Sequence, residues 1–210
     1  MKIIFLGAPG AGKGTQADRV SARLGIPTIS TGAIIRAAIK DGTKMGLEAK
    51  KFIDLGALVP DDVVIEIVKE RLNESDCDKG YILDGFPRSV PQAHALDNMG
   101  VYLDKVISLE VSDEDIIERM TGRRVCPECG KTYHVIHLRS TVGGKCESCG
   151  TKLAVRADDA PDVVRSRLEV YHSTTEPLKD FYREKGILCI VDGADSVEET
   201  TKRTLEALGI

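Results

Sequence analysis

The sequence predicts an α/β protein whose core is a doubly wound, parallel sheet of five strands. Short apolar runs alternate along the chain with longer segments whose apolar residues recur at helical spacing, and a glycine-rich turn follows the first apolar run. Of the 210 residues, 42% are hydrophobic and 30% are charged, as in a globular protein with a substantial core. Strands that alternate with helices imply helices on both faces of the sheet and a ligand site at the carboxyl ends of the strands.

The expected elements follow one another from the N-terminus. Strands are expected at residues 3–6, 27–30, 81–83, 106–109 and 187–191, and helices at 14–24, 60–72, 93–99, 116–120, 161 onward and 197–208. Pro177 should start a new helix or kink the one before it. Glycines punctuate two helical stretches between residues 30 and 59, and from 122 to 159 the periodicity weakens. We therefore expect a core of residues 1–29, 60–121 and 160–210 that carries a helical insertion and a second small module.

The glycine-rich turn is Gly7-Ala8-Pro9-Gly10-Ala11-Gly12-Lys13-Gly14-Thr15. Backbone N–H groups at such a turn converge at the positive end of the following helix dipole, and glycines let them approach phosphate oxygens closely. Lys13 can reach the outer phosphates of a nucleoside triphosphate, and Thr15 can offer its hydroxyl to Mg²⁺. Gly14 places this hydroxyl one position later than in the usual motif. The sequence thus predicts a sheet of the P-loop NTPase type, with phosphate contacts from Gly10, Ala11, Gly12, Lys13, Gly14 and Thr15.

A carboxylate is expected beside this loop. The strand at 81–83 ends at Asp84, and Gly85-Phe86-Pro87-Arg88 follows at once. In a phosphate-loop fold an acid at this place suits Mg²⁺ and its waters. The alternative is that Asp84 only caps the following turn.

Four of the six cysteines form two Cys-x2-Cys pairs, Cys126/Cys129 and Cys146/Cys149, with the spacing of a zinc ribbon. Four thiolates leave no open position for water, so the expected Zn²⁺ is structural. A module this small buries too little apolar surface to be stable without such a metal. His134 and His137 are nearby as rival ligands, and iron or cobalt could occupy the same thiolates. Taken alone, the segment could also be a ribbon that binds nucleic acid.

The overall charge limits the partners. The net charge of −4 argues against a general nucleic-acid surface, although Arg119, Arg123 and Arg124 form a local basic cluster. No apolar run approaches the length that spans a bilayer, and the N-terminus lacks the pattern of a secretory signal. A cytoplasmic protein with no membrane partner is therefore expected.

Several motifs together resemble the adenylate kinase family. They are the loop from Gly7 to Thr15, Thr31-Gly32 with Arg36, Asp84 to Arg88 with Gln92, Thr121-Gly122-Arg123-Arg124 entering the four-cysteine segment, and Arg156-x-Asp158-Asp159 with Arg167. The chain looks like the long-lid, zinc-containing bacterial type over essentially its full length. One position departs from the family pattern, because Ala33 follows the Thr-Gly pair where the family usually has an acid.

This resemblance implies a reaction and a set of mobile parts. The reaction is reversible transfer of the γ-phosphoryl group of Mg-ATP to AMP, giving two ADP, in the service of adenine nucleotide homeostasis. Residues 30–59 would form the domain that binds the nucleoside monophosphate, and residues 122–159 would form the zinc-binding lid. The family further implies a monomer. The rival functions are a kinase for UMP, CMP or another monophosphate and, in a different class, a regulatory ATPase with a nucleic-acid-binding ribbon.

The resemblance also assigns site residues. The AMP site would comprise Thr31, Arg36, Ala57, Leu58, Val59, Gly85, Phe86, Pro87, Arg88, Gln92, Arg156 and Arg167, with Gln92 reading adenine. The ATP site would add Arg119, Arg123, Thr132, Tyr133 and a backbone contact near Ala194 or Asp195 to the phosphate loop. The catalytic residues would be Lys13, Asp84, Arg88, Arg123, Arg156 and Arg167. Arginine suits this work because its planar fork pairs with phosphate and stays charged when water is excluded.

Overall fold

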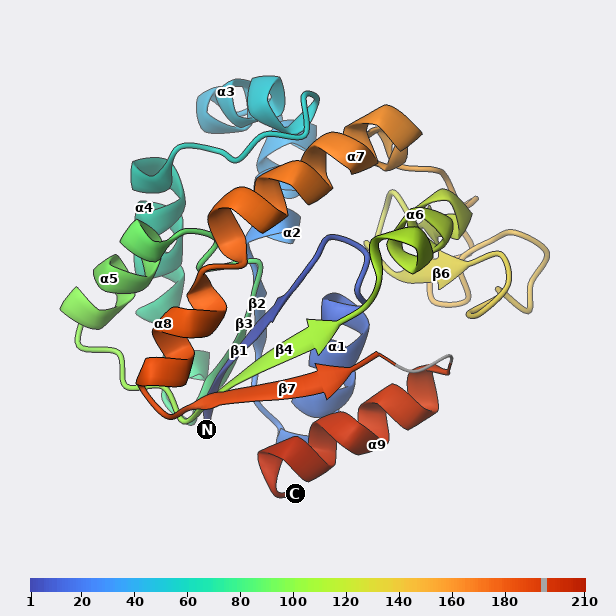
Figure 1. The fold of residues 1–210 in the computed structure, drawn as a ribbon. Helices are drawn as coiled ribbons and strands as arrows, with labels where there is room; N and C mark the ends of the chain where they lie inside the picture. The colour runs from blue at the N-terminus through green and yellow to red at the C-terminus, as the bar shows by residue number, and fades with distance from the viewer. Residues whose placement is uncertain (194–195) are drawn as a thin grey trace.

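The computed structural model describes residues 1–193 and 196–210 and has a five-stranded sheet at its centre (Figure 1). The strands are β1 (Lys2–Gly7), β2 (Thr28–Ser30), β3 (Tyr81–Asp84), β4 (Lys105–Glu110) and β7 (Leu188–Asp192). Their order is β2-β3-β1-β4-β7, and every neighbouring pair is parallel. The predicted parallel sheet is confirmed, and β1 lies in its middle with the phosphate loop at its carboxyl end.

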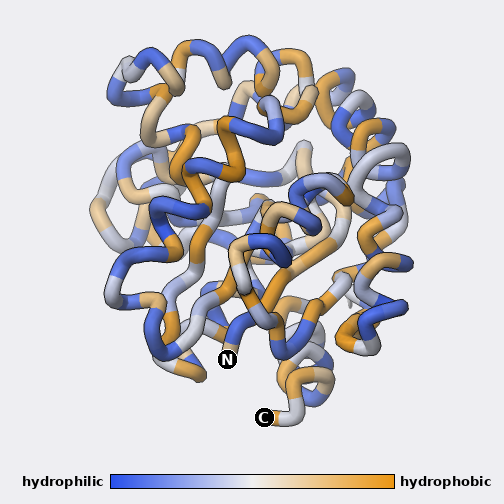
Figure 2. Tube along the Cα trace, turned by 90° about the vertical axis from the view of Figure 1, so that its left-hand side faces the viewer, coloured by the Kyte–Doolittle hydropathy of each residue, from blue (hydrophilic) through white to orange (hydrophobic). Residues whose placement is uncertain are grey.

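Helices cover both faces of this sheet. On one side lie α1 (Lys13–Leu24) and α9 (Val197–Leu208), and on the other α4 (Asp61–Leu72), α5 (Val90–Asn98) and α8 (Leu178–Glu184) (Figure 1). Successive residues of β1 serve the two faces in turn, since Ile3 and Phe5 belong to the α1/α9 core and Ile4 and Leu6 to the core beneath α4, α5 and α8. Figure 2 shows the hydrophobic run of the strands through the middle of the molecule, with hydrophilic residues interspersed along the outer helices.

The two segments predicted as insertions follow the carboxyl ends of strands, the first directly after β2 and the second after a helix that follows β4. The first holds α2 (Thr31–Lys40) and α3 (Lys44–Ile53). Ser30 and Thr43 accept hydrogen bonds from the backbone N–H groups of Ala33 and Gly46, so each helix begins at a hydroxyl cap. The second follows α6 (Asp113–Gly122) and holds an antiparallel pair of short strands, β5 (Arg123–Val125) and β6 (Thr132–His134).

The predicted break near Pro177 is present. Helix α7 (Pro161–Val170) passes into a π-helical turn at Tyr171–Thr175, and α8 begins just after Pro177. Short 3₁₀ turns occur at Ser75–Cys77 and Ala157–Asp159. Within the part of the chain that the structure describes, no helix combines the length and the apolar character needed to cross a bilayer.

Candidate functional site

The phosphate loop joins β1 to α1. Gly12 precedes α1 with φ 98°, a left-handed conformation that favours glycine, and the helix starts at Lys13. The first N–H groups of α1 therefore have no partner within the helix and face the loop. Lys13 Nζ folds back over the loop and donates to the carbonyl oxygens of Gly7 and Ala8 at 2.7 and 2.8 Å.

Lys13 lies in a strongly electropositive setting. Burial, opposed in part by attraction to Asp84 and reinforced by repulsion from Arg88, Arg167 and Arg123, lowers the pKa of Lys13 to about 8. A phosphate placed against Nζ would favour the charged form again. The loop is therefore arranged to gain from an anion.

Asp84 stands beside the loop, as the sequence predicted. It ends β3, opposite Phe5 of β1 and Ser30 of β2, and the Ser30 hydroxyl donates to its Oδ2 at 3.3 Å. A Cβ at Gly14 would lie 3.5 Å from the same oxygen, so the departure from the usual motif leaves room next to this carboxylate. Asp84 and the Thr15 hydroxyl are the hard oxygen donors that Mg²⁺ prefers, so the donor set fits this ion.

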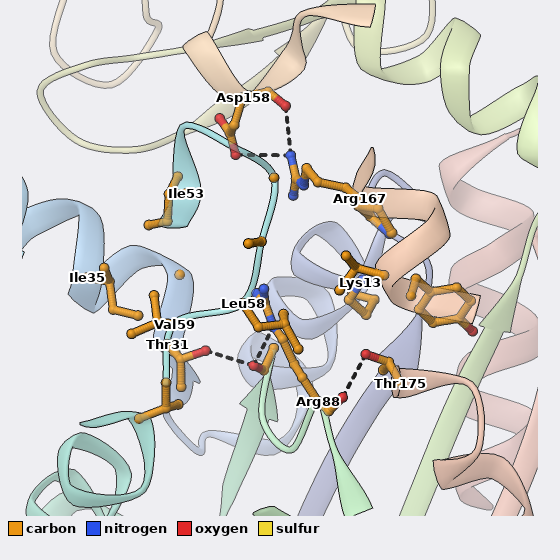
Figure 3. Close-up of a pocket in the computed structure, with 18 of the residues that line it drawn as sticks. Lys13, Thr31, Ile35, Ile53, Leu58, Val59, Arg88, Asp158, Arg167 and Thr175 are labelled. Carbon is orange, nitrogen blue, oxygen red and sulfur yellow. Dashed lines mark hydrogen bonds and ion pairs between the residues drawn. The ribbon is translucent and has the colours of Figure 1, made fainter. Parts of the chain in front are cut away.

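A cavity opens between the loop, α2, residues 53–59, the β3–α5 connection and α7 (Figure 3). In Figure 3 the side chains of Lys13, Arg88 and Arg167 approach it from different elements. Most of the predicted AMP residues line it, namely Thr31, Arg36, Ala57, Leu58, Val59, Gly85, Pro87, Arg88, Gln92, Arg156 and Arg167. Phe86 is the exception, because its side chain is fully buried in the core next to a cis Phe86–Pro87 peptide.

Gly85 organises one wall of the cavity. Its carbonyl oxygen accepts from Thr31 Oγ1 and from Arg88 Nε, both at 2.9 Å. The residue has φ 81°, and a Cβ would come within 2.9 Å of Arg88 Nη2 and 3.1 Å of Thr31 Oγ1. A side chain at this position would displace the arginine, so glycine is required here.

Two carboxylates hold three further arginines. Asp158 accepts from Arg156 Nε at 2.8 Å and from Arg167 Nη1 at 3.0 Å, and Asp159 accepts from Arg123 Nε at 2.8 Å. Burial alone would raise the pKa of Asp158, but its bonds to Arg156 and the charge of Arg167 hold it at about 2. Burial lowers the pKa of Arg167 to about 10. The sequence contained the motif Arg156-x-Asp158-Asp159, yet it did not reveal that these acids position the cations.

Thr175 is a further residue that the sequence reasoning missed. It closes the π-helical turn, lines the cavity and donates its hydroxyl to the carbonyl oxygen of Arg88 at 2.8 Å (Figure 3). A threonine within an expected helix gives no local signal of such a role, because its partner is 87 residues away.

The predicted ATP residues beyond the loop are more scattered. Arg119 lies in α6 and Arg123 directly after it, next to the cavity wall. Thr132 is exposed on β6, whereas Tyr133 is buried beneath the cysteines, where its hydroxyl donates to Cys146 Sγ at 3.5 Å and accepts from the N–H of Glu147 at 2.8 Å. Ala194 and Asp195 lie outside the described residues.

The four cysteines of the two pairs meet at one point. Their sulfur atoms all lie within 4.8 Å of one another, with Cys126–Cys149 at 3.3 Å, Cys129–Cys146 at 3.5 Å and Cys129–Cys149 at 3.8 Å. A tetrahedral Zn²⁺ with Zn–S bonds of about 2.3 Å requires sulfur separations of roughly 3.8 Å, so this set fits the ion. The cluster contains only cysteines, while His134 and His137 stack on each other with ring centroids 4.6 Å apart.

A parallel sheet with a phosphate loop, facing a cavity lined by arginines, defines the class of P-loop phosphotransferases. The family model described as adenylate kinase matches residues 5–187. The chain is also 51% identical to an adenylate kinase of Caldicellulosiruptor bescii and 52% identical to one of Ruminiclostridium cellulolyticum, over 100% of both chains in each comparison. An adenylate kinase of Thermodesulfovibrio yellowstonii is 53% identical over 95% of this chain and 94% of its own. The chain therefore belongs to the adenylate kinase family.

Proposed function

We propose that the protein transfers the γ-phosphoryl group of Mg-ATP reversibly to AMP, giving two ADP, and that the residues described above carry this reaction. The observation that carries the assignment is a single cavity into which the phosphate-loop lysine, Arg88 and Arg167 all project (Figure 3). Such an array suits a phosphoryl group held between two nucleotides, because charge on its equatorial oxygens grows during transfer.

The chemistry requires little beyond charge and position. The phosphate of AMP is already an anion at pH 7, so its attack needs no general base. In this proposal the loop and Lys13 hold the ATP phosphates, Arg119 of α6 and Arg123 directly after it face ATP, and Arg88, Arg156 and Arg167 surround the transferred group. Mg²⁺, when bound near Asp84 and Thr15, neutralises phosphate charge.

The acceptor would lie against α2 and the β3–α5 connection. Thr31, Arg36, Gly85 and Arg88 would hold the AMP phosphate and ribose side of the cavity, and residues 57–59 and Gln92 would hold its base. The lining residues are consistent with this division. Pyrimidine monophosphates remain rivals for the acceptor site, and Gln92 is the reason for favouring adenine.

The same proposal includes the moving parts. Residues 30–59 and 122–159 would be mobile domains on the core of residues 1–29, 60–121 and 160–210, with the second hinged near residues 121–122 and 159–160. Closure would exclude water, which competes with AMP for the phosphoryl group. The four cysteines would hold a structural Zn²⁺, and the enzyme would work as a cytoplasmic monomer, which sedimentation and cell fractionation test.

The decisive assay measures ADP formed from ATP and AMP with Mg²⁺, beside CMP, UMP, GMP and a reaction without an acceptor. ADP formed with AMP alone supports the proposal. Preference for another monophosphate would keep the chemistry and change the acceptor. Loss of ATP without any acceptor would indicate an ATPase instead.

A further inference from the structure

The amide of Gln92 is engaged on both of its ends. Its Oε1 accepts from the backbone N–H of Arg88 at 2.7 Å, and its Nε2 donates to Asp61 Oδ1 at 2.6 Å. Gln92 is only 1% exposed and still lines the cavity. Each end can still make one more hydrogen bond, because the amide oxygen has a second lone pair and the amide nitrogen has a second hydrogen.

Asp61 is the first residue of α4, the helix that packs beside α5 (Figure 1). Its second carboxylate oxygen accepts from the Ser89 hydroxyl at 2.8 Å. Ser89 caps α5 and accepts from the backbone N–H of Gln92 at 3.3 Å. The carboxylate thus joins the start of α4 to both the cap of α5 and the Gln92 side chain.

These partners allow only one orientation of the amide. An ionised carboxylate can only accept hydrogen bonds, so it must face the NH₂ group, and the Arg88 N–H can only donate, so it must face the oxygen. Rotating the amide by half a turn would oppose two acceptors at Asp61 and two donors at Arg88. Both contacts would then be unfavourable in a buried site.

We propose that Asp61 is a positioning residue that locks the Gln92 amide and thereby makes the enzyme select 6-amino over 6-oxo purine monophosphates; this inference rests on the proposed function. Adenine presents a donor at its 6-amino group and an acceptor at N1, so it pairs with a fixed amide oxygen and nitrogen, respectively. Hypoxanthine presents an acceptor at O6 and a donor at N1, the reversed pattern. Only an amide free to rotate can serve both bases, and a site with fixed polar groups rejects the mismatched one.

The test compares kcat/KM for AMP and for IMP in the wild type and in Asp61→Asn. The asparagine keeps the volume of the aspartate but can offer either oxygen or NH₂ to Gln92, so the constraint at this end of the amide is lost and only the Arg88 N–H still favours one orientation. Because one of the two constraints is removed, we expect the AMP/IMP selectivity to fall about fivefold to tenfold, chiefly through a higher kcat/KM for IMP, with KM for ATP unchanged. Asp62→Asn is the matched control, because Asp62 lies in the same first turn of α4 and is exposed. It should leave the selectivity within about twofold.

A purely structural role for Asp61 would give a different result. Loss of a helix-terminal carboxylate would lower the melting temperature and would lower kcat/KM for AMP and for IMP by the same factor. The AMP/IMP selectivity would then equal that of the wild type, and this outcome overturns the inference. Asp61→Ser gives a second reading if Asp61→Asn does not fold, since a serine hydroxyl can also either donate or accept and should relax the selectivity in the same direction. A wild-type enzyme that makes no ADP from ATP and AMP would instead refute the proposed function.

Discussion

The phosphate cavity and the cysteine module (residues 122–159) each gather side chains that carry the same charge when ionised, but they stabilise them differently. In the cavity, the guanidinium groups of Arg156 and Arg167 both pair with Asp158 of the same chain. In the module, the cysteine sulfurs face one another, and balancing four thiolates requires a cation from outside.

The hydrophobic support differs in the same way. The phosphate loop stands on a sheet that has a large buried cluster on each face. The cysteine module has a cluster of only Cys126, Tyr133 and Cys146, with Leu153 packed against it. The stabilising free energy of the hydrophobic effect is roughly proportional to the apolar area that is buried. The sheet therefore buries enough to hold a charged site in place, whereas burial in the module is too small to stabilise its fold. The cavity is therefore specified by the chain alone, whereas the module, in the function proposed above, would depend on a bound metal.

Removal of the metal should produce the largest difference between the two regions. Structural Zn²⁺ contributes on the order of 10 kcal/mol of apparent binding free energy. If the module binds Zn²⁺ as proposed, its removal should unfold the module while the sheet stays folded. During chelation we expect an early calorimetric transition and proteolytic cleavage between residues 122 and 159, and both should appear before the affinity for AMP falls. An identical melting curve with and without the metal would contradict this expectation.

Lys13→Met should greatly reduce turnover without unfolding the sheet. Removing one preorganised donor from a transferring phosphoryl group costs about 10²–10³ in kcat. The sheet should keep its melting temperature, because its two clusters do not include Lys13. Turnover and thermal unfolding are measured together, with the exposed Lys51→Met as the control. Near-normal turnover in a folded Lys13→Met variant would refute the role given to the loop.

Asp159→Ala should show how far the cavity depends on its own carboxylates. The Asp159 side chain is fully buried and pairs with Arg123, so its removal leaves a largely buried cation uncompensated, at a cost of about 3 kcal/mol in the free energy of unfolding. Urea unfolding measures this loss. Asp162→Ala removes an exposed pair to Arg165 and should cost less than about 1 kcal/mol. Equal losses in the two variants would mean that burial of the pair is unimportant.

The pH dependence of ATP binding should report the titration of Lys13. The pKa of Lys13 in the free protein is lowered to about 8, and bound phosphate favours its charged form. Below pH 8 the lysine is charged in both the free and the ATP-bound protein, so ATP affinity changes little with pH. Above pH 8 binding must take up a proton, so ATP affinity should fall by at most about tenfold for each pH unit. Calorimetry at pH 9 in two buffers of different ionisation enthalpy counts this proton, and Lys13→Met should show no uptake.

The smallest effect is expected where the two insertions touch. Lys40 of α2 and Glu128 of the cysteine module form an exposed ion pair at 3.2 Å. Such a pair contributes at most about 1 kcal/mol and weakens with salt. Lys40→Glu should raise KM for AMP by no more than about fivefold at low ionic strength, and adding Glu128→Lys should restore it. A double variant no better than the single one would show that the contact does not couple the insertions.

The sequence by itself determined the parallel sheet, the phosphate loop and the meeting of the two cysteine pairs. Each rests on local rules: alternation of side chains along strands such as β1, the left-handed conformation that favours glycine at Gly12, and the tight knuckle between paired cysteines. The placement of most predicted AMP residues around one cavity was implied by the resemblance to the adenylate kinase family.

Tertiary structure decided which way the side chains of those motifs face and what holds them. Phe86 stands within a site motif but packs into the core, and Tyr133 supports a cysteine instead of lining the cavity. The bond from Asp61 to Gln92 joins residues 31 apart, and the bond from Thr175 to Arg88 joins residues 87 apart. Local periodicity cannot specify such pairs, because their geometry exists only once separate helices have packed against the sheet and fixed the distances between them.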